Sequence, residues 1–273
     1  MKKIGKFLKG AYLGIVLFFM YTPILVMMVM AFTDSRSVTR WQGFSFGAFG
    51  KLFADNDVKD ALVVTLTVAV IATILSTVIG TATAIGLHSM KKRPRSVVET
   101  ITQLPMTNPD LVTGISMMLL FAVIGLSQDW GLLRLIIAHV TFDIPYVIFS
   151  VLPKLRQSSD MLYEAALDLG CNPAQAIIKV VIPDIMPGIV SGALLAFTLS
   201  LDDFVISYFT GGAINNLSMY IFSKTKKAVD TEFCALSLLM FAVVGVLLLV
   251  INLRSIKQEK EAAAQNKKVM RKS

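Results

Sequence analysis

Two long runs of this sequence contain no charged residue, and they decide what the chain can fold into. They extend over residues 11–32 and 61–87. About 20 apolar residues in a helix cross the roughly 30 Å hydrocarbon layer of a bilayer, so each run is long enough for one crossing. Composition agrees, because only 16% of the residues are charged, against about 25% in ordinary soluble domains. The chain is therefore a membrane protein, and not a soluble enzyme or a disordered chain.

Four further stretches predict additional spans. Residues 233–253 are also free of charge, whereas residues 104–126, 131–152 and 185–208 contain prolines and ionisable side chains. The predicted fold class is an all-α polytopic membrane protein with six transmembrane helices. We expect the first span to stay as an uncleaved anchor, because its apolar run exceeds the 7–15 residues of a typical signal peptide.

The positions of Lys and Arg predict the orientation of the spans. Of the 26 basic residues, 18 lie in residues 1–10, 88–100, 153–184 and 254–273, and seven lie in the opposite loops 33–60 and 209–232. Basic residues are enriched on the cytoplasmic side, so both termini are predicted to be cytoplasmic. The predicted domains are a basic tail over 1–10, a six-span transmembrane domain over 11–253 and a charged tail over 254–273. This tail is expected to be attracted to anionic membrane lipid.

Several functions are excluded by what the loops lack. After six spans the longest loop has about 30 residues, which is too short for a nucleotide-binding or catalytic domain, and no phosphate-binding loop motif occurs. Cys171 and Cys234 are far apart, so no metal site is predicted. The basic residues flank spans, which argues against nucleic acid as a partner. We expect no catalytic residue and no cofactor in this chain.

The loop over residues 158–187 predicts two short helices joined by a sharp elbow. Apolar residues recur with helical spacing, and the first helix is expected to end at Gly170, where a left-handed residue fits. Asn172 is a suitable cap for the second helix and Pro173 suits its first position, with Pro183 expected to stop that helix. Helices this short need a packing partner. The elbow rests either on its own spans alone or also in a groove on another protein.

These residues carry a resemblance to a known family. Glu164-Ala165-Ala166-x-x-x-Gly170, followed by Val180-Val181-Ile182-Pro183, resembles the EAA loop of ABC importer permeases. The resemblance implies the type I ABC importer permease fold. It also implies that Glu164, Ala165, Ala166 and Gly170 form the coupling elbow that docks on an ATP-binding subunit.

The likeness extends along most of the chain and points to the polyamine (spermidine/putrescine) permease subgroup, in particular to its shorter six-span subunit. The matching stretches are residues 41–44, 108–116, 139–146 and 200–209, with Asp143 as a departure from the expected neutral residue. The implied partners are a second permease subunit, two ATP-binding cassette subunits that hold ATP and Mg²⁺, and an extracytoplasmic substrate-binding protein. The implied location is the cell membrane of a prokaryote.

Acidic residues at membrane depth are costly and usually face a partner, a cavity or a substrate path. Asp110 follows Pro109 at an expected break in the third span, where it either lines the cargo path or caps the restarting helix. Asp202 and Asp203 lie toward the outer end of the fifth span, where one of them contacts a cationic cargo or both pair with basic residues nearby. Tyr208 and Trp41 offer aromatic faces to ammonium groups, or belong to the interfacial aromatic belt.

The fourth span contains three further ionisable residues. His139 and Asp143 are four residues apart on one helix, so they form either a hydrogen-bonded structural pair or a proton relay. Arg134 is expected to extend to the outer surface. Together with Asp110, His139 and Asp143 define a rival hypothesis, in which the chain is an ion-coupled secondary transporter or a channel for organic cations.

Overall fold

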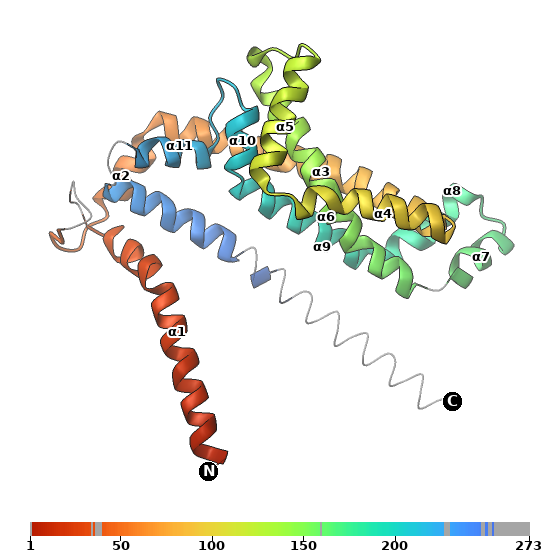
Figure 1. The fold of residues 1–273 in the computed structure, drawn as a ribbon, viewed down its shortest axis with the longest axis horizontal. Helices are drawn as coiled ribbons and strands as arrows, with labels where there is room; N and C mark the ends of the chain where they lie inside the picture. The colour runs from red at the N-terminus through yellow and green to blue at the C-terminus, as the bar shows by residue number, and fades with distance from the viewer. Residues whose placement is uncertain are drawn as a thin grey trace. The chain divides into compact units, whose positions relative to one another are not determined.

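The computed structural model describes residues 2–33, 35, 40–158, 160–226, 230–246, 249–250 and 253. Within them the regular structure is helical, as predicted, with no strand (Figure 1). The elements are α1 (Lys2–Met30), α2 (Gly47–Ala54), α3 (Asn56–Ser89), α4 (Lys92–Thr107), α5 (Asp110–Val123), the 3₁₀-helix η1 (Gln128–Trp130), α6 (Gly131–Gln157), α7 (Asp160–Asp168), α8 (Pro173–Ala176), the π-helix η2 (Ile177–Val181), α9 (Ile182–Asp202), α10 (Val205–Thr210), α11 (Leu217–Thr225) and an apolar helix over Thr231–Val246. The predicted tail over 254–273 lies outside the described residues.

The helices form two compact units. One contains residues 1–60 and 220–245, and the other contains residues 61–219 and 246–273. The second unit holds the predicted elbow and most of the intramembrane ionisable residues.

The core of the second unit is the contact between α6 and α9, which lie side by side in Figure 1. Glycine permits this close approach, because a Cβ atom on Gly192 would lie 3.1 Å from the Cα atom of Val147. Buried aliphatic side chains from α3, α6 and α9 fill the space around the contact. A second apolar cluster joins α5, α6 and α10 through Phe121, Phe142 and Ile206. These clusters hold α10 and the end of α9 in place.

Among the residues that the structure describes, four helical stretches are long and apolar enough to cross a membrane. They are Tyr12–Met30, Asn56–Ser89, Gln128–Gln157 and Pro173–Asp202. A fifth span is counted if α4 and α5 are taken together, and the helix over Thr231–Val246 is shorter. The multi-pass helical architecture is therefore confirmed, while the number six and the side on which the termini lie stay predictions.

The third predicted span differs most from the structure. Instead of one helix over 104–126, α4 and α5 meet at an angle of 103°. Asn108 has the extended conformation (φ −78°, ψ 145°) that a following proline favours, and Pro109 immediately precedes the first residue of α5. The predicted break is present, and it turns the chain sharply.

Candidate functional site

The elbow begins with α7, which ends as its sequence predicts. Gly170 has a φ of +87°, a conformation that L side chains rarely adopt. Around it, the backbone N–H of Cys171 donates to the carbonyl of Ala166 at 3.0 Å, and that of Gly170 donates to Leu167 at 2.9 Å. This pair of bonds is the Schellman arrangement. No atom within 4 Å would meet a Cβ on Gly170, so the backbone turn alone requires glycine here.

The second arm of the elbow starts at a complete capping box. The Asn172 side chain accepts from the backbone N–H of Gln175 at 2.9 Å, and the Gln175 side chain accepts from the N–H of Asn172 at 3.2 Å. Pro173 occupies the first turn, as predicted. These reciprocal bonds satisfy donors that a helix start otherwise leaves unpaired.

The expectation that Pro183 stops this second helix is wrong. After α8 the chain forms the π-helix η2, and α9 then runs through Pro183 to Asp202. Pro183 is the second residue of α9 and directly follows η2, and the helix continues through it. The elbow is therefore joined to the long helix α9 through a π-helical segment.

Most of the elbow's predicted docking residues lie at its surface. Glu164, Ala165 and Gly170 are exposed, whereas Ala166 is buried. Large apolar side chains are exposed on the same elbow, namely Met161, Leu162, Leu169 and Ile178. Apolar groups gathered on one exposed segment indicate a protein contact surface.

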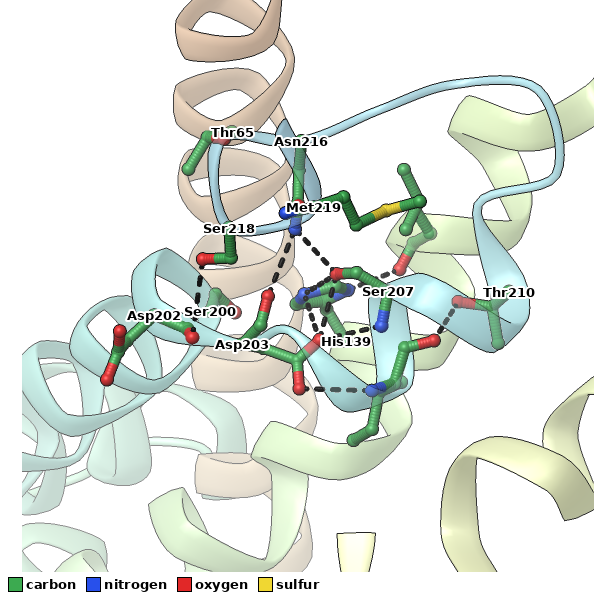
Figure 2. Close-up of polar contacts among 12 residues, drawn as sticks. Thr65, His139, Ser200, Asp202, Asp203, Ser207, Thr210, Asn216, Ser218 and Met219 are labelled. Carbon is green, nitrogen blue, oxygen red and sulfur yellow. Dashed lines mark hydrogen bonds and ion pairs between the residues drawn. The ribbon is translucent and has the colours of Figure 1, made fainter. Parts of the chain in front are cut away.

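At the other end of α9, Asp203 is the centre of a buried polar cluster, which we call the Asp203 cluster (His139, Asp203, Ser207 and Asn216; Figure 2). The Asp203 carboxylate accepts from the backbone N–H groups of Ile206 at 3.2 Å and Ser207 at 2.7 Å, and from the Ser207 hydroxyl at 2.8 Å. The Nε2 atom of His139 lies 3.6 Å from the same carboxylate. Asp203 thus holds the first turn of α10.

Asn216, in the loop between α10 and α11, completes the Asp203 cluster. Its side-chain amide donates to the carbonyl of Asp203 at 3.0 Å and to the hydroxyl of Ser207 at 2.7 Å. One residue later, the backbone N–H of Leu217 donates to the Thr65 hydroxyl of α3 at 2.8 Å. The cluster therefore joins α6, α10 and the start of α11, and the Leu217 bond ties it to α3.

The structure separates the two neighbouring acids of the fifth predicted span. Because α9 ends at Asp202, Asp203 has an extended backbone rather than a helical one. The side chain of Asp203 is 8% exposed, whereas Asp202 is exposed. The predicted single helix over 185–208 is thus interrupted at Asp203. The first backbone N–H groups of α10 have no helical acceptor, and the Asp203 carboxylate accepts from them instead.

The ionisable residues of α6 also differ from expectation. His139 pairs through Nδ1 with the carbonyl of Leu135 at 2.8 Å, and Asp143 accepts from the Ser200 hydroxyl at 2.7 Å. His139 and Asp143 are thus bonded to different residues and not to each other. Arg134 is only 5% exposed and lies 5.3 Å from the Phe121 ring centroid, so the expected extension to the outer surface is wrong.

Three candidate cargo-path residues lie exposed on the second unit. Asp110 is the first residue of α5, with Pro109 as its N-cap, so its carboxylate comes one residue too late to cap that helix. Asp202 ends α9, and Tyr208 on α10 is about half exposed. Trp41 is also exposed but belongs to the first unit. Asp203 is the one candidate whose side chain is turned into the fold.

Two polar residues at and beside the Asp203 cluster could not be predicted from the sequence. Thr65 and Asn216 are ordinary polar residues, and their roles depend on contacts with distant segments. Ser200 and Ser207 fall within the stretch 200–209 that resembles the permease family, and hydroxyl groups inside an apolar span are a usable signal of a buried hydrogen bond.

A protein family and several of its members are similar in sequence to most of this chain. The family model described as "binding-protein-dependent transport system inner membrane component" matches residues 76–256. The spermidine/putrescine transport system permease protein PotC of Haemophilus influenzae is 35% identical over 235 residues, covering 86% of this chain and 91% of the relative. The putrescine transport system permease protein PotI of Escherichia coli K12 is 37% identical over 234 residues, covering 84% and 83%.

Solved structures share the fold at lower identity. A chain of a bacterial ABC transporter involved in the import of the acidic polysaccharide alginate aligns with a TM-score of 0.69 and 20% identity, covering 94% of this chain and 98% of that one. A second structure, of the alginate transporter in complex with a pentasaccharide-bound periplasmic protein, aligns with a TM-score of 0.67 and 19% identity, covering 93% and 95%. The chain therefore belongs to the family of binding-protein-dependent transport system inner membrane components.

Proposed function

We propose that this chain is a permease subunit of an ATP-driven importer that carries polyamines such as spermidine and putrescine into the cell. The observation that carries the proposal is the elbow, which combines two locally capped helices with an exposed apolar surface and the exposed acid Glu164. Relatives at 35% and 37% identity are polyamine permeases by name, which supports this class of cargo.

The proposed assembly has a second permease subunit, two ATP-binding subunits and an extracytoplasmic binding protein. The ATP-binding subunits hold ATP and Mg²⁺, and their closure moves the elbow, which is joined to α9 through η2. Rocking of the spans then alternates access to the cargo path. Multi-pass helices and the family support a membrane location, for which we propose the cell membrane of a prokaryote with both termini in the cytoplasm.

The cargo path is proposed to use the exposed acids Asp110 and Asp202. A dehydrated polyamine carries several ammonium groups that need anionic partners, and the exposed ring of Tyr208 offers a further contact for such a group. The rival proton-coupled carrier is not favoured, because His139 and Asp143 are bonded to different residues and do not form a continuous relay with each other.

Reconstitution of the complete transporter tests the proposal. Uptake of labelled spermidine into liposomes should require ATP hydrolysis, and uptake that persists without the ATP-binding subunits would overturn it. Glu164→Lys should uncouple hydrolysis from uptake, because it reverses the charge at the proposed docking surface. Asp60→Lys, an exposed charge reversal near the start of α3, should leave the ATP-to-spermidine ratio unchanged. An unchanged ratio in Glu164→Lys would contradict the docking role.

A further inference from the structure

A cavity of about 600 Å³ lies where the elbow joins the spans. Its walls come from the end of α3, the start of α4, the end of α6, the helix α7 and both ends of the π-helix η2. The volume is in the range of small-ligand sites. An occupant would contact the elbow and the segments that connect it to the spans at the same time.

One wall of the cavity is basic. Lys92 and Arg95 line it from the first turns of α4. Arg95 donates through Nε to Glu99 at 2.8 Å, and Glu99 also accepts from Arg156 at 3.0 Å. The negative charge of Glu99 is thus shared between two guanidinium groups. It therefore does not neutralise the positive charge of Lys92. Glu164 is the one acid among the lining residues.

The start of α4 adds to this positive character. Its first turn contains no acidic residue, and its N-cap, Lys91, makes no capping hydrogen bond through its side chain. A helix N-terminus carries a partial positive charge of its own. Basic residues at this position cost electrostatic free energy within the chain, and an anion bound in the cavity would offset that cost.

The opposite walls are apolar. They are formed by side chains of α6, α7 and η2, namely Leu155, Leu162, Ile177 and Val181. A cavity with one basic and one apolar wall is complementary to an anion that carries hydrocarbon. Basic pockets between membrane helices on the cytoplasmic side bind the phosphate-bearing headgroups of anionic lipids.

We propose that this cavity binds the headgroup of an anionic phospholipid of the cytoplasmic leaflet. The phosphodiester lies against Lys92 and Arg95, and the upper acyl chain lies along the apolar wall. This inference rests on the proposed function, which places the elbow at the cytoplasmic surface. Since the cavity touches α7 and both ends of η2, the bound lipid stiffens the joint through which the elbow acts on α9.

Retention of lipid by the complete transporter tests the site directly. The complex is assembled in nanodiscs of phosphatidylcholine with a minority of phosphatidylglycerol, and the retained phosphatidylglycerol is counted by mass spectrometry. Lys92→Gln should lower retention about tenfold, since it removes a direct hydrogen bond to the charged phosphodiester, and such a bond contributes about 1.5 kcal/mol or more. Arg93→Gln is the matched control, because Arg93 is exposed on the same turn and does not line the cavity, and its effect should be smaller than twofold.

Further measurements distinguish the effect of the cavity's shape from that of its charge, and a bound lipid from a soluble anion. Ser89→Phe keeps every charge and fills part of the cavity, so it should also lower retention, and unchanged retention would contradict the proposal. Equal losses of retained phosphatidylglycerol in Lys92→Gln and Arg93→Gln would overturn the proposal, because they would indicate a diffuse electrostatic attraction of lipid to the basic surface. Inorganic phosphate that releases phosphatidylglycerol at millimolar concentration would assign the cavity to a soluble anion instead of a lipid. Spermidine uptake in phosphatidylcholine liposomes reports separately on the proposed function.

Discussion

At the scale of single residues, two adjacent acids have opposite surroundings. Asp203 accepts three hydrogen bonds within the fold, while Asp202 is exposed at the end of α9. The Asp203 carboxylate therefore stabilises the start of α10, whereas the carboxylate of Asp202 remains accessible to a cationic cargo.

Replacing these two acids should separate stability from transport. Asp203→Ala removes the acceptor at the start of α10, and loss of such a cap costs about 1–2 kcal/mol. We expect a clear fall in the Tm of the detergent-solubilised transporter. Asp202→Ala is the matched neighbour and should leave the Tm unchanged while slowing spermidine uptake. A larger Tm loss in Asp202→Ala would contradict these assignments.

A second residue contact, in the first unit, predicts a dependence on pH. The Tyr220 hydroxyl donates to Asp55 at 2.7 Å, and the Lys224 ammonium lies 3.7 Å from the same carboxylate. The hydrogen bond from Tyr220 is the main cause that holds the pKa of Asp55 below its ordinary value. The contact therefore stabilises the fold above the ordinary pKa of Asp55, and this stabilisation is lost as the pH falls through the lowered pKa.

Tyr220→Phe should remove this dependence. We expect it to lower the Tm at pH 6, with a difference from the natural chain that shrinks at pH 3, as thermal unfolding in detergent can measure. Tyr21→Phe, at an exposed position on α1, is the control and should show no pH-dependent difference. A Tyr220→Phe difference that grows toward low pH would have the wrong sign for this account.

At the scale of elements, local chemistry was predictable and tertiary contacts were not. Gly170, Asn172 and Pro173 act through bonds to residues within five positions, so the sequence sufficed to predict the elbow. The break before α5 was predicted for the same reason, because proline restricts its own neighbours. The π-helix η2 has no such local signature, and its presence made the expected stop at Pro183 wrong.

The Asp203 cluster illustrates the opposite case. The bond that ties it to α3, from Leu217 to Thr65, joins residues 152 positions apart, and no spacing rule relates them. Asp143 likewise bonds to Ser200, on α9, which a helical i, i+4 interpretation of His139 and Asp143 could not anticipate. The acids of this site could be predicted from the sequence, but their hydrogen-bond partners depend on how the helices pack.

Packing between elements gives a further prediction. A Cβ atom on Gly80 of α3 would lie 2.8 Å from the Cβ atom of Val147 on α6, whereas a Cβ on Gly86, on the same helix, would meet no atom within 4 Å. Gly80→Ala should destabilise the transporter by about 1–3 kcal/mol through overpacking. Gly86→Ala should be neutral or stabilising, because alanine favours helix over glycine by about 1 kcal/mol. Thermal unfolding of both variants checks this, and equal Tm values would contradict the packing.

At the scale of the whole molecule, much of the apolar surface is left for other molecules to cover. None of the apolar stretch Tyr12–Met30 of α1 is buried within the chain, and the elbow exposes its own apolar side chains. Lipid or a second permease subunit is expected to cover α1, and an ATP-binding subunit is expected to cover the elbow. The chain thus has the surfaces of a subunit that works within a larger assembly.

Site-specific crosslinking of the elbow in the assembled transporter tests the central claim most directly. Ala165→Cys, in a chain that also carries Cys171→Ser, should crosslink to the ATP-binding subunit, with a yield that changes when ATP is added. Ala213→Cys, at an exposed position in the loop after α10, should capture none of it. Failure of Ala165→Cys to capture the ATP-binding subunit, in a complex that contains it, would contradict the proposal that the elbow transmits the force of ATP hydrolysis.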